Sequence, residues 1–357
     1  MPANLHLAHT SDVLLTWAVF LYAFAMLGYA AEFAAGRRAS ARHGQSGIAR
    51  DADAAGRSHR LTAWFGRGAV GLTFAGWGFH VAAVTTRGVA VHRVPWGNMY
   101  EFSCMVTLVA VTTYLFLLTQ PRVRTAITGK QRSTETVRSL GAFVMAPIIL
   151  YLGLAGTVLY AAPGPLVPAL NSYWIKIHVV AAITATGAFL VSGVITMLYL
   201  LKERYERGLP PLRVTLLARL RSPMNPQRVS LGPGTAAAVE MGAARGGLMK
   251  ALPSAASLDR MAYRVITFAF PVWTFAIIAG AIWAEQAWSR YWGWDPKETW
   301  SFITWLGYAA YLHARATAGW RGRRAAMLSL IAFGALMVDY YVVNTVITGL
   351  HSYAGIS

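Results

Sequence analysis

The sequence predicts an all-α integral membrane protein, a bundle of about eight transmembrane helices that forms a single polytopic domain over residues 1–357. The first observation is composition: 56% of the 357 residues are apolar or aromatic and only 13% are charged, whereas roughly a quarter of the residues of soluble domains are charged. The second is that long apolar stretches recur along the chain. The third is that basic residues gather between alternate stretches. This composition excludes a soluble globular enzyme.

Eight stretches are predicted as transmembrane helices, because about 20 residues rising 1.5 Å each cross a hydrocarbon core of about 30 Å. The first has no basic segment before it, as a signal peptide would, so we expect it to remain in the mature protein. The eight stretches cover roughly 12–31, 69–86, 99–118, 139–160, 178–201, 263–284, 301–317 and 325–347.

Basic residues predict the orientation of these helices. Of the 32 Lys and Arg residues, 27 fall in four groups, within 36–68, 122–138, 202–264 and 315–324. Cytoplasmic loops carry such an excess, so these loops are predicted to be cytoplasmic and both termini extracytoplasmic. The net charge of +18 is then a property of loops, and no nucleic-acid partner is expected. The loops 32–68 and 202–262, rich in Arg, Gly and Ala, are predicted to be flexible.

The external segment 285–300, EQAWSRYWGWDPKETW, has the most unusual composition. An aromatic belt at the membrane interface is one explanation, but it does not account for so many tryptophans beside two acids and a lysine. Such a cluster suits a large, flat, apolar ligand with polar edges. Pro296 directly after Asp295 predicts that this acid caps the seventh helix. The tryptophans are Trp288, Trp292, Trp294 and Trp300.

Two histidines are predicted at the same depth as this segment. His178 begins the fifth stretch at its outer end, and His351 follows the last stretch, also outside. Each alone could be an ordinary hydrogen-bonded histidine at the membrane interface. Together, two neutral imidazoles can hold a haem iron axially over an aromatic floor.

These residues resemble a known family. The string YWGWDPKETW, with His178 before it and GLHSYA after it, is similar to the tryptophan-rich WWD signature of the CcsA/ResC family of system II cytochrome c biogenesis, to which CcmC and CcmF are related. VPWGNMYEF at 94–102 and the final VNTVITGLHSY add to the resemblance. Ser289 departs from it, because a glycine is expected there, and this puts the local loop geometry in doubt.

The resemblance implies a subunit of a holocytochrome c synthase, or cytochrome c haem lyase. With a second membrane protein of the CcsB/ResB (Ccs1) type, it would carry haem b, transiently and without a covalent bond, to the outer face for thioether attachment to C-x-x-C-H of an apocytochrome c. It implies His178 and His351 as external axial ligands and His313 as an intramembrane one. It also implies a haem platform made by Trp288, Trp292, Trp294, Asp295 and Trp300. We expect the bacterial plasma membrane rather than a thylakoid.

Residue chemistry agrees with that implication. The single cysteine, Cys104, cannot hold haem by two thioethers, so any haem is expected to bind reversibly. His313 is predicted about 20 Å inside the membrane and His80 about 9 Å, which is too different for one iron. We therefore expect a histidine of the partner subunit beside His313. Asp339, costly in mid-span, is expected to pair with another group or to line a cavity.

Two other functions remain open at this point. A respiratory b-type cytochrome subunit usually has paired histidines on one helix, and no predicted span holds two. A permease for haem or another small molecule is harder to separate, because transport and presentation could be stages of one act.

Overall fold

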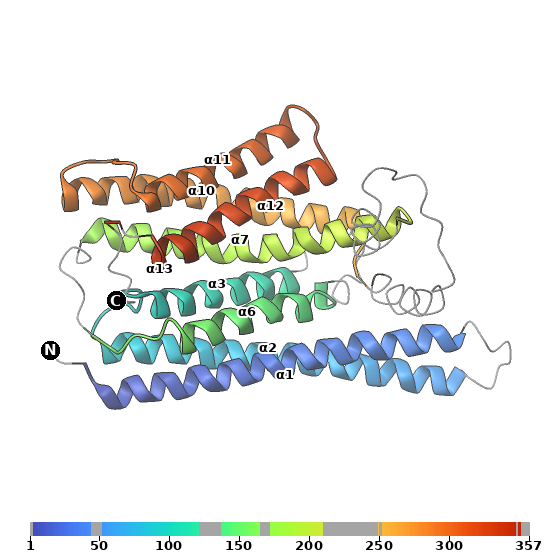
Figure 1. Cartoon of the computed structure of the whole chain (residues 1–357). Coiled ribbons are helices and arrows are strands. Elements are labelled where there is room, and N and C mark those ends of the chain that lie inside the picture. The colour runs from blue at the N-terminus through green and yellow to red at the C-terminus, as the bar shows by residue number, and fades with distance from the viewer. Residues whose placement is uncertain are drawn as a thin grey trace, which may run out of the picture.

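The computed structural model describes residues 3–43, 52–120, 137–164, 172–209, 249, 252–347 and 349–350. Within them the chain is helical, and the helices lie roughly along one direction as an elongated bundle (Figure 1). The helices are α1 (Leu5–His43), α2 (Ala52–Ala90), α3 (Met99–Thr119), α6 (Gly141–Thr157), α7 (Tyr173–Glu206), α10 (Ala255–Trp288), α11 (Pro296–Ala316), α12 (Arg323–Met337), the π-helix η3 (Val338–Val342) and α13 (Val343–Thr345).

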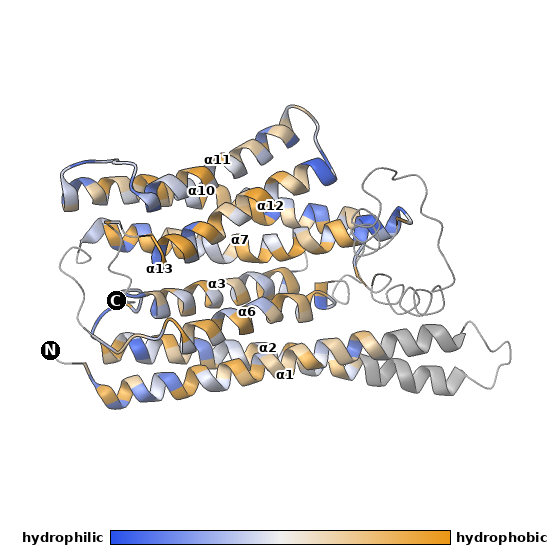
Figure 2. Cartoon of the chain, in the orientation of Figure 1, coloured by the Kyte–Doolittle hydropathy of each residue, from blue (hydrophilic) through white to orange (hydrophobic). Residues whose placement is uncertain are grey.

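Each of the eight predicted spans coincides with a helix, the last being the continuous run α12–η3–α13. Six of these helices are long and apolar enough to cross a membrane, and α6 is a shorter apolar helix of 17 residues. Their apolar residues extend over the middle of the bundle (Figure 2). The chain is therefore a multi-pass membrane protein. Which side each end faces stays a prediction, although α1 begins and α13 ends at the same end of the bundle.

Helix α7 lies at the centre of the bundle (Figure 1) and packs against α3, α6, α10 and α12. Small residues let it approach its neighbours closely. A Cβ at Gly187 would lie 2.8 Å from the Val106 carbonyl oxygen, and one at Gly193 would lie 2.9 Å from the Phe333 ring. Close approach through small residues is the usual basis of helix packing in membranes. This packing fixes the position of α7, whose second turn carries His178.

The loops are shorter than predicted. Segment 32–68 was expected to be flexible, but α1 continues to His43 and α2 begins at Ala52. The prediction was wrong for these residues because Ala and Arg favour helix without raising hydropathy. In 202–262, α7 continues to Glu206 and α10 begins at Ala255, and residues 210–248 and 250–251 lie outside the described part. In 285–300, only 289–295 lie between helices.

Candidate functional site

A cavity opens at the end of the bundle where α7 begins and α10 ends. The space between the surrounding side chains is about 1300 Å³, including the part open to solvent. Its walls come from α3 and the loop before it, from α7, α10 and the start of α11, and from the α12–η3–α13 run. The aromatic residues that line it include Trp96, Trp273, Trp283, Trp288, Tyr291 and Trp292. A cavity of this aromatic character suits an organic ligand.

His178 lines this cavity from the second turn of α7. Its Nδ1 lies 2.8 Å from the carbonyl oxygen of Ala276 in α10. A carbonyl only accepts, so Nδ1 carries the hydrogen and the lone pair of the neutral ring is on Nε2. Gly280 makes this position possible, since a Cβ there would lie 2.6 Å from Nδ1. Metal-ligating histidines are usually oriented in this way, by a hydrogen bond from the other ring nitrogen.

The tryptophans of the predicted segment separate into two groups. Trp288, the last residue of α10, and Trp292 both line the cavity. Trp288 packs edge-on against buried Trp283, with ring centroids 4.8 Å apart. Trp294 is 65% exposed, and neither it nor Trp300 lines the cavity. Within the described structure, then, half of the predicted tryptophan platform borders the ligand space.

The loop between α10 and α11 is fixed by unusual backbone geometry and by capping. Ser289 ends α10 with φ of 54°, in the left-handed region that favours glycine, which explains why a glycine was expected there. Asp295 caps α11 in a capping box with Glu298, as predicted. Asp295 also accepts a hydrogen bond from the Leu350 amide, 2.9 Å away. Asp295 is not among the residues that line the cavity.

Charged residues form one side of the cavity. Lys297, at the start of α11, donates through Nζ to the backbone oxygen of Asp339 at 2.9 Å and lies 3.5 Å from its Oδ2. Asp339 is 3% exposed and lies in η3. Both residues line the cavity, so the two expectations for Asp339, pairing and lining, are confirmed. Sequence reasoning counted Lys297 among the polar groups that would orient the rim of a flat ligand, but it did not predict the contact with Asp339.

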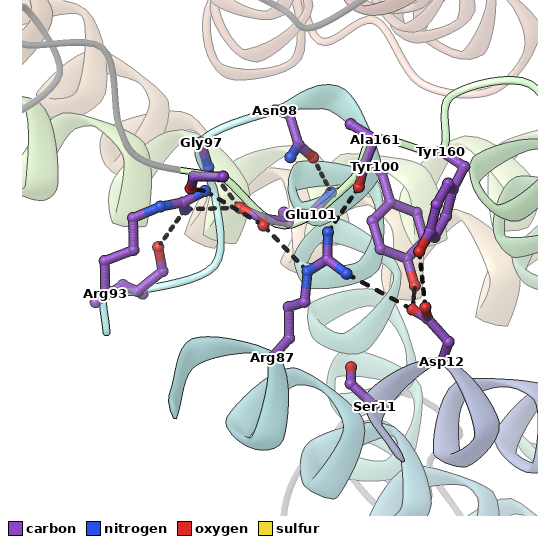
Figure 3. A network of polar contacts seen from close by, with 12 residues as sticks. Ser11, Asp12, Arg87, Arg93, Gly97, Asn98, Tyr100, Glu101, Tyr160 and Ala161 are labelled. Carbon is purple, nitrogen blue, oxygen red and sulfur yellow. Dashed lines mark hydrogen bonds and ion pairs between the residues drawn. The ribbon is translucent and has the colours of Figure 1, made fainter. Parts of the chain in front are cut away.

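A buried ionic network supports the wall formed by α3 and the loop before it (Figure 3). The Glu101 side chain is fully buried at the start of α3. One carboxylate oxygen lies 3.2 Å from Nε of Arg87, and the other lies 2.7 Å from Nη1 of Arg93 and 2.9 Å from the Gly97 amide. The network therefore fixes the 94–102 loop, whose Trp96 lines the cavity. The sequence contained this motif, but not the pairing inside it.

The network continues to α1. Asp12 accepts hydrogen bonds from the hydroxyl groups of Tyr100 at 2.9 Å and Tyr160 at 2.8 Å, and its Oδ1 lies 3.7 Å from Nη1 of Arg87. Arg87 also donates through Nη2 to the carbonyl oxygen of Ala161 at 2.7 Å. Four segments distant in sequence are thus joined at this end of the bundle (Figure 3).

The sequence is similar to known proteins of one family. Residues 96–351 match the cytochrome C assembly protein family. The chain belongs to this family. It is 34% identical over 296 residues to the cytochrome c biogenesis protein CcsA of Gloeobacter violaceus, covering 77% of this chain and 82% of the relative. It is 42% identical over 197 residues to CcsA of Synechococcus elongatus, covering 53% and 60%. It is 33% identical over 287 residues to CcsA of Trieres chinensis, covering 76% and 81%.

The other histidines predicted for a family member lie elsewhere. His351 is outside the described residues. His313 is in the last turn of α11 and is exposed on the bundle surface, about 25 Å along the helix from Pro296. His80 is completely buried in α2, with Nδ1 3.4 Å from the Tyr22 hydroxyl of α1. Helices α2 and α11 lie on opposite sides of the bundle (Figure 1), so His80 and His313 are not brought together.

Proposed function

We propose that this chain, acting in cytochrome c biogenesis, binds haem in the cavity and presents it for covalent attachment to apocytochrome c. The observation that carries the proposal is the orientation of His178. Its Nδ1 bonds the Ala276 carbonyl, so the lone pair of the neutral ring is on Nε2, and the residue lines a space bordered by tryptophans. A neutral imidazole presented in this way is a haem iron ligand.

The residues of the cavity suit haem in shape and chemistry. Trp288 and Trp292 offer faces for the porphyrin ring, and we propose Trp294 and Trp300 as the outer part of the same aromatic surface, with Asp295 supporting it as the cap of α11. His351 is proposed as the second axial ligand. Bound haem supplies the vinyl groups to which cysteine thiols of C-x-x-C-H add as thioethers. This chain would bind haem without a covalent bond, orient it and limit the access of water.

We propose further that the chain is one subunit of a holocytochrome c synthase, together with a CcsB/ResB (Ccs1)-type membrane protein. The exposure of His313 on α11 supports this proposal, because an ionisable residue facing lipid is costly and a partner helix would remove that cost. A histidine of that partner would then complete an intramembrane haem site with His313. The plasma membrane of a bacterium, with its outer face active, is proposed in preference to a thylakoid.

The test replaces the proposed ligand in the complex with its partner. His178→Ala is expected to abolish haem attachment to a co-expressed apocytochrome c, measured by pyridine haemochrome spectra, while the thermal unfolding of the complex is unchanged. Added imidazole should restore attachment by occupying the vacated coordination position. The control is His92→Asn, since His92 is exposed at the same end of the bundle and does not line the cavity. Normal attachment by His178→Ala without imidazole would refute the proposal.

A further inference from the structure

We propose that Lys297 recognises a carboxylate of the ligand in the cavity, and that Asp339 is the positioning residue that holds Lys297 ready for it. The inference rests on the proposed function and deepens it, because haem carries two propionate groups and the carboxylate in question is one of them. The resemblance described above assigns ligand roles to the tryptophans and the histidines and none to Lys297, although the motif YWGWDPKETW contains it. The lysine–aspartate pair is seen only in the folded structure.

Lys297 is placed to meet an anion. It is the second residue of α11, and the N-terminus of a helix carries a positive partial charge. Its side chain is 26% exposed, and among the residues that line the cavity it is the one Lys or Arg. A dianionic ligand in this cavity has no other fixed positive side chain to approach within the described structure.

The hydrogen bonds of Lys297 leave room for a ligand. An ammonium group has three N–H donors. In the part of the chain that the structure describes, Nζ contacts the backbone oxygen of Asp339 at 2.9 Å and Oδ2 of the same residue at 3.5 Å. One donor remains for the cavity. A hydrogen bond from an ammonium group to a carboxylate is about twice as strong as a neutral one, and exclusion of water by aromatic walls strengthens it further.

The π-helix explains how Asp339 holds the lysine. The five residues of η3 interrupt the regular hydrogen bonding of the last helix, and side chains bond the carbonyl oxygens instead. Asn344 Nδ2 donates to the oxygens of Asp339 at 3.3 Å and Tyr340 at 2.6 Å, and Lys297 donates to the former. Single π-turns within helices occur frequently at functional sites. Here the π-turn fixes a long side chain that would otherwise lose about 2 kcal/mol of rotamer entropy on binding.

The nearby carboxylates do not cancel the attraction. The carboxylate of Asp339 lies 3.5 Å from Nζ, a longer contact than the 2.9 Å bond to its backbone oxygen, so a ligand carboxylate can compete with it for the ammonium group. Glu298 directs Oε2 to the loop, where it accepts the amide hydrogens of Gly293 at 2.7 Å and Asp295 at 3.2 Å. Backbone donors and the helix terminus compensate part of its charge, whereas its Oε1 has no hydrogen-bond partner among the described residues. The ligand carboxylate is expected at Lys297, on the side away from Glu298.

The experiment compares haem with haem dimethyl ester, which has the same iron and ring but no carboxylate. Both are titrated optically into the purified complex in detergent. The wild type should bind haem roughly tenfold more tightly than the ester, as expected for one charged hydrogen bond. Lys297→Met should lose that preference by weakening haem binding while leaving ester binding unchanged. Asp339→Asn keeps the backbone oxygen that accepts from Nζ and removes only the side-chain charge 3.5 Å away, so its preference for haem should be at least that of the wild type. Loss of the preference in this variant would contradict positioning by the backbone oxygen.

Each outcome is informative. Wild-type preference for haem over the ester in Lys297→Met overturns the role of Lys297 and leaves the proposed function standing. Failure of the wild type to bind either porphyrin overturns the proposed function as well. Ester binding serves as the check on folding. Should Lys297→Met fail that check, Lys297→Gln, which keeps a donor without the charge, replaces it, and an unchanged preference again overturns the proposal.

Discussion

Two groups of charged residues lie at the same end of the bundle and differ in how completely their carboxylates are hydrogen-bonded. Around Glu101, both carboxylate oxygens accept hydrogen bonds from arginines, and one also accepts the Gly97 amide. Around the cavity, Lys297 keeps an unused donor, and Glu298 Oε1 is buried without a hydrogen-bond partner among the described residues. In the first group the carboxylate is fully bonded, although Arg87 Nη1 and Arg93 Nε have no hydrogen-bond partner among the described residues. In the second group a carboxylate oxygen is itself left over.

This difference distinguishes a group that stabilises the structure from a group that is able to bind a ligand. A buried carboxylate with both oxygens bonded makes the conformation around it more rigid, and Glu101 does this for the loop that forms one cavity wall. Unused polar capacity in a buried place is costly unless something occupies it. A ligand carboxylate would accept a hydrogen bond from the unused donor of Lys297. Three predictions test this division.

The largest effect is expected from removing the negative charge of Glu101. Glu101→Gln leaves two largely buried arginines without their anion and should lower the free energy of unfolding by roughly 3 kcal/mol. Glu298→Gln should cost less than about 1 kcal/mol, because glutamine also serves in a capping box. Thermal unfolding of both variants in the same detergent measures the difference. Equal losses would remove the distinction between the two groups.

An intermediate effect is expected at the histidine. In Gly280→Ala the new Cβ would lie 2.6 Å from Nδ1 of His178, so the ring must move away from the Ala276 carbonyl. Haem affinity should fall about tenfold, the loss of one oriented hydrogen bond, with little change in unfolding. The matched control is Gly153→Ala, also a helical glycine but with nothing within 4 Å. It should leave haem binding unchanged, and equal haem affinity in both variants would contradict the prediction.

The smallest effect is expected in the loop between α10 and α11. Ser289 has φ of 54°, and a residue with a Cβ pays about 1 kcal/mol for this left-handed conformation. Ser289→Gly should therefore raise the free energy of unfolding by about that amount. Ser289→Ala keeps the Cβ and should give no gain. The denaturant midpoints of the two variants are the measurement, and a gain in alanine as large as in glycine would show that backbone strain is not the cause.

Hydropathy predicted the eight helices and their order, because each span needs about 20 apolar residues wherever its neighbours lie. It did not predict how far α1, α2 and α7 continue, since the extra turns are polar. For the site, the clustering of aromatic residues indicated Trp288 and Trp292, and position at a span end indicated His178. The Lys297–Asp339 pair joins residues 42 apart in the chain, and the Tyr100–Asp12 bond joins residues 88 apart. Tertiary packing creates such pairs, and a single sequence does not encode them locally.

The length of the α1–α2 hairpin has a consequence for the opposite end of the molecule. Each helix has 39 residues, or about 58 Å, and the two lie side by side along their length (Figure 1). The bilayer interior takes up about 30 Å of that, and the Asp12–Arg87 contact anchors the hairpin near one membrane surface. The larger part of the excess then projects from the other surface as a two-helix rod. A protein that approaches from that side would meet the flank of this rod before it reached the lipid headgroups.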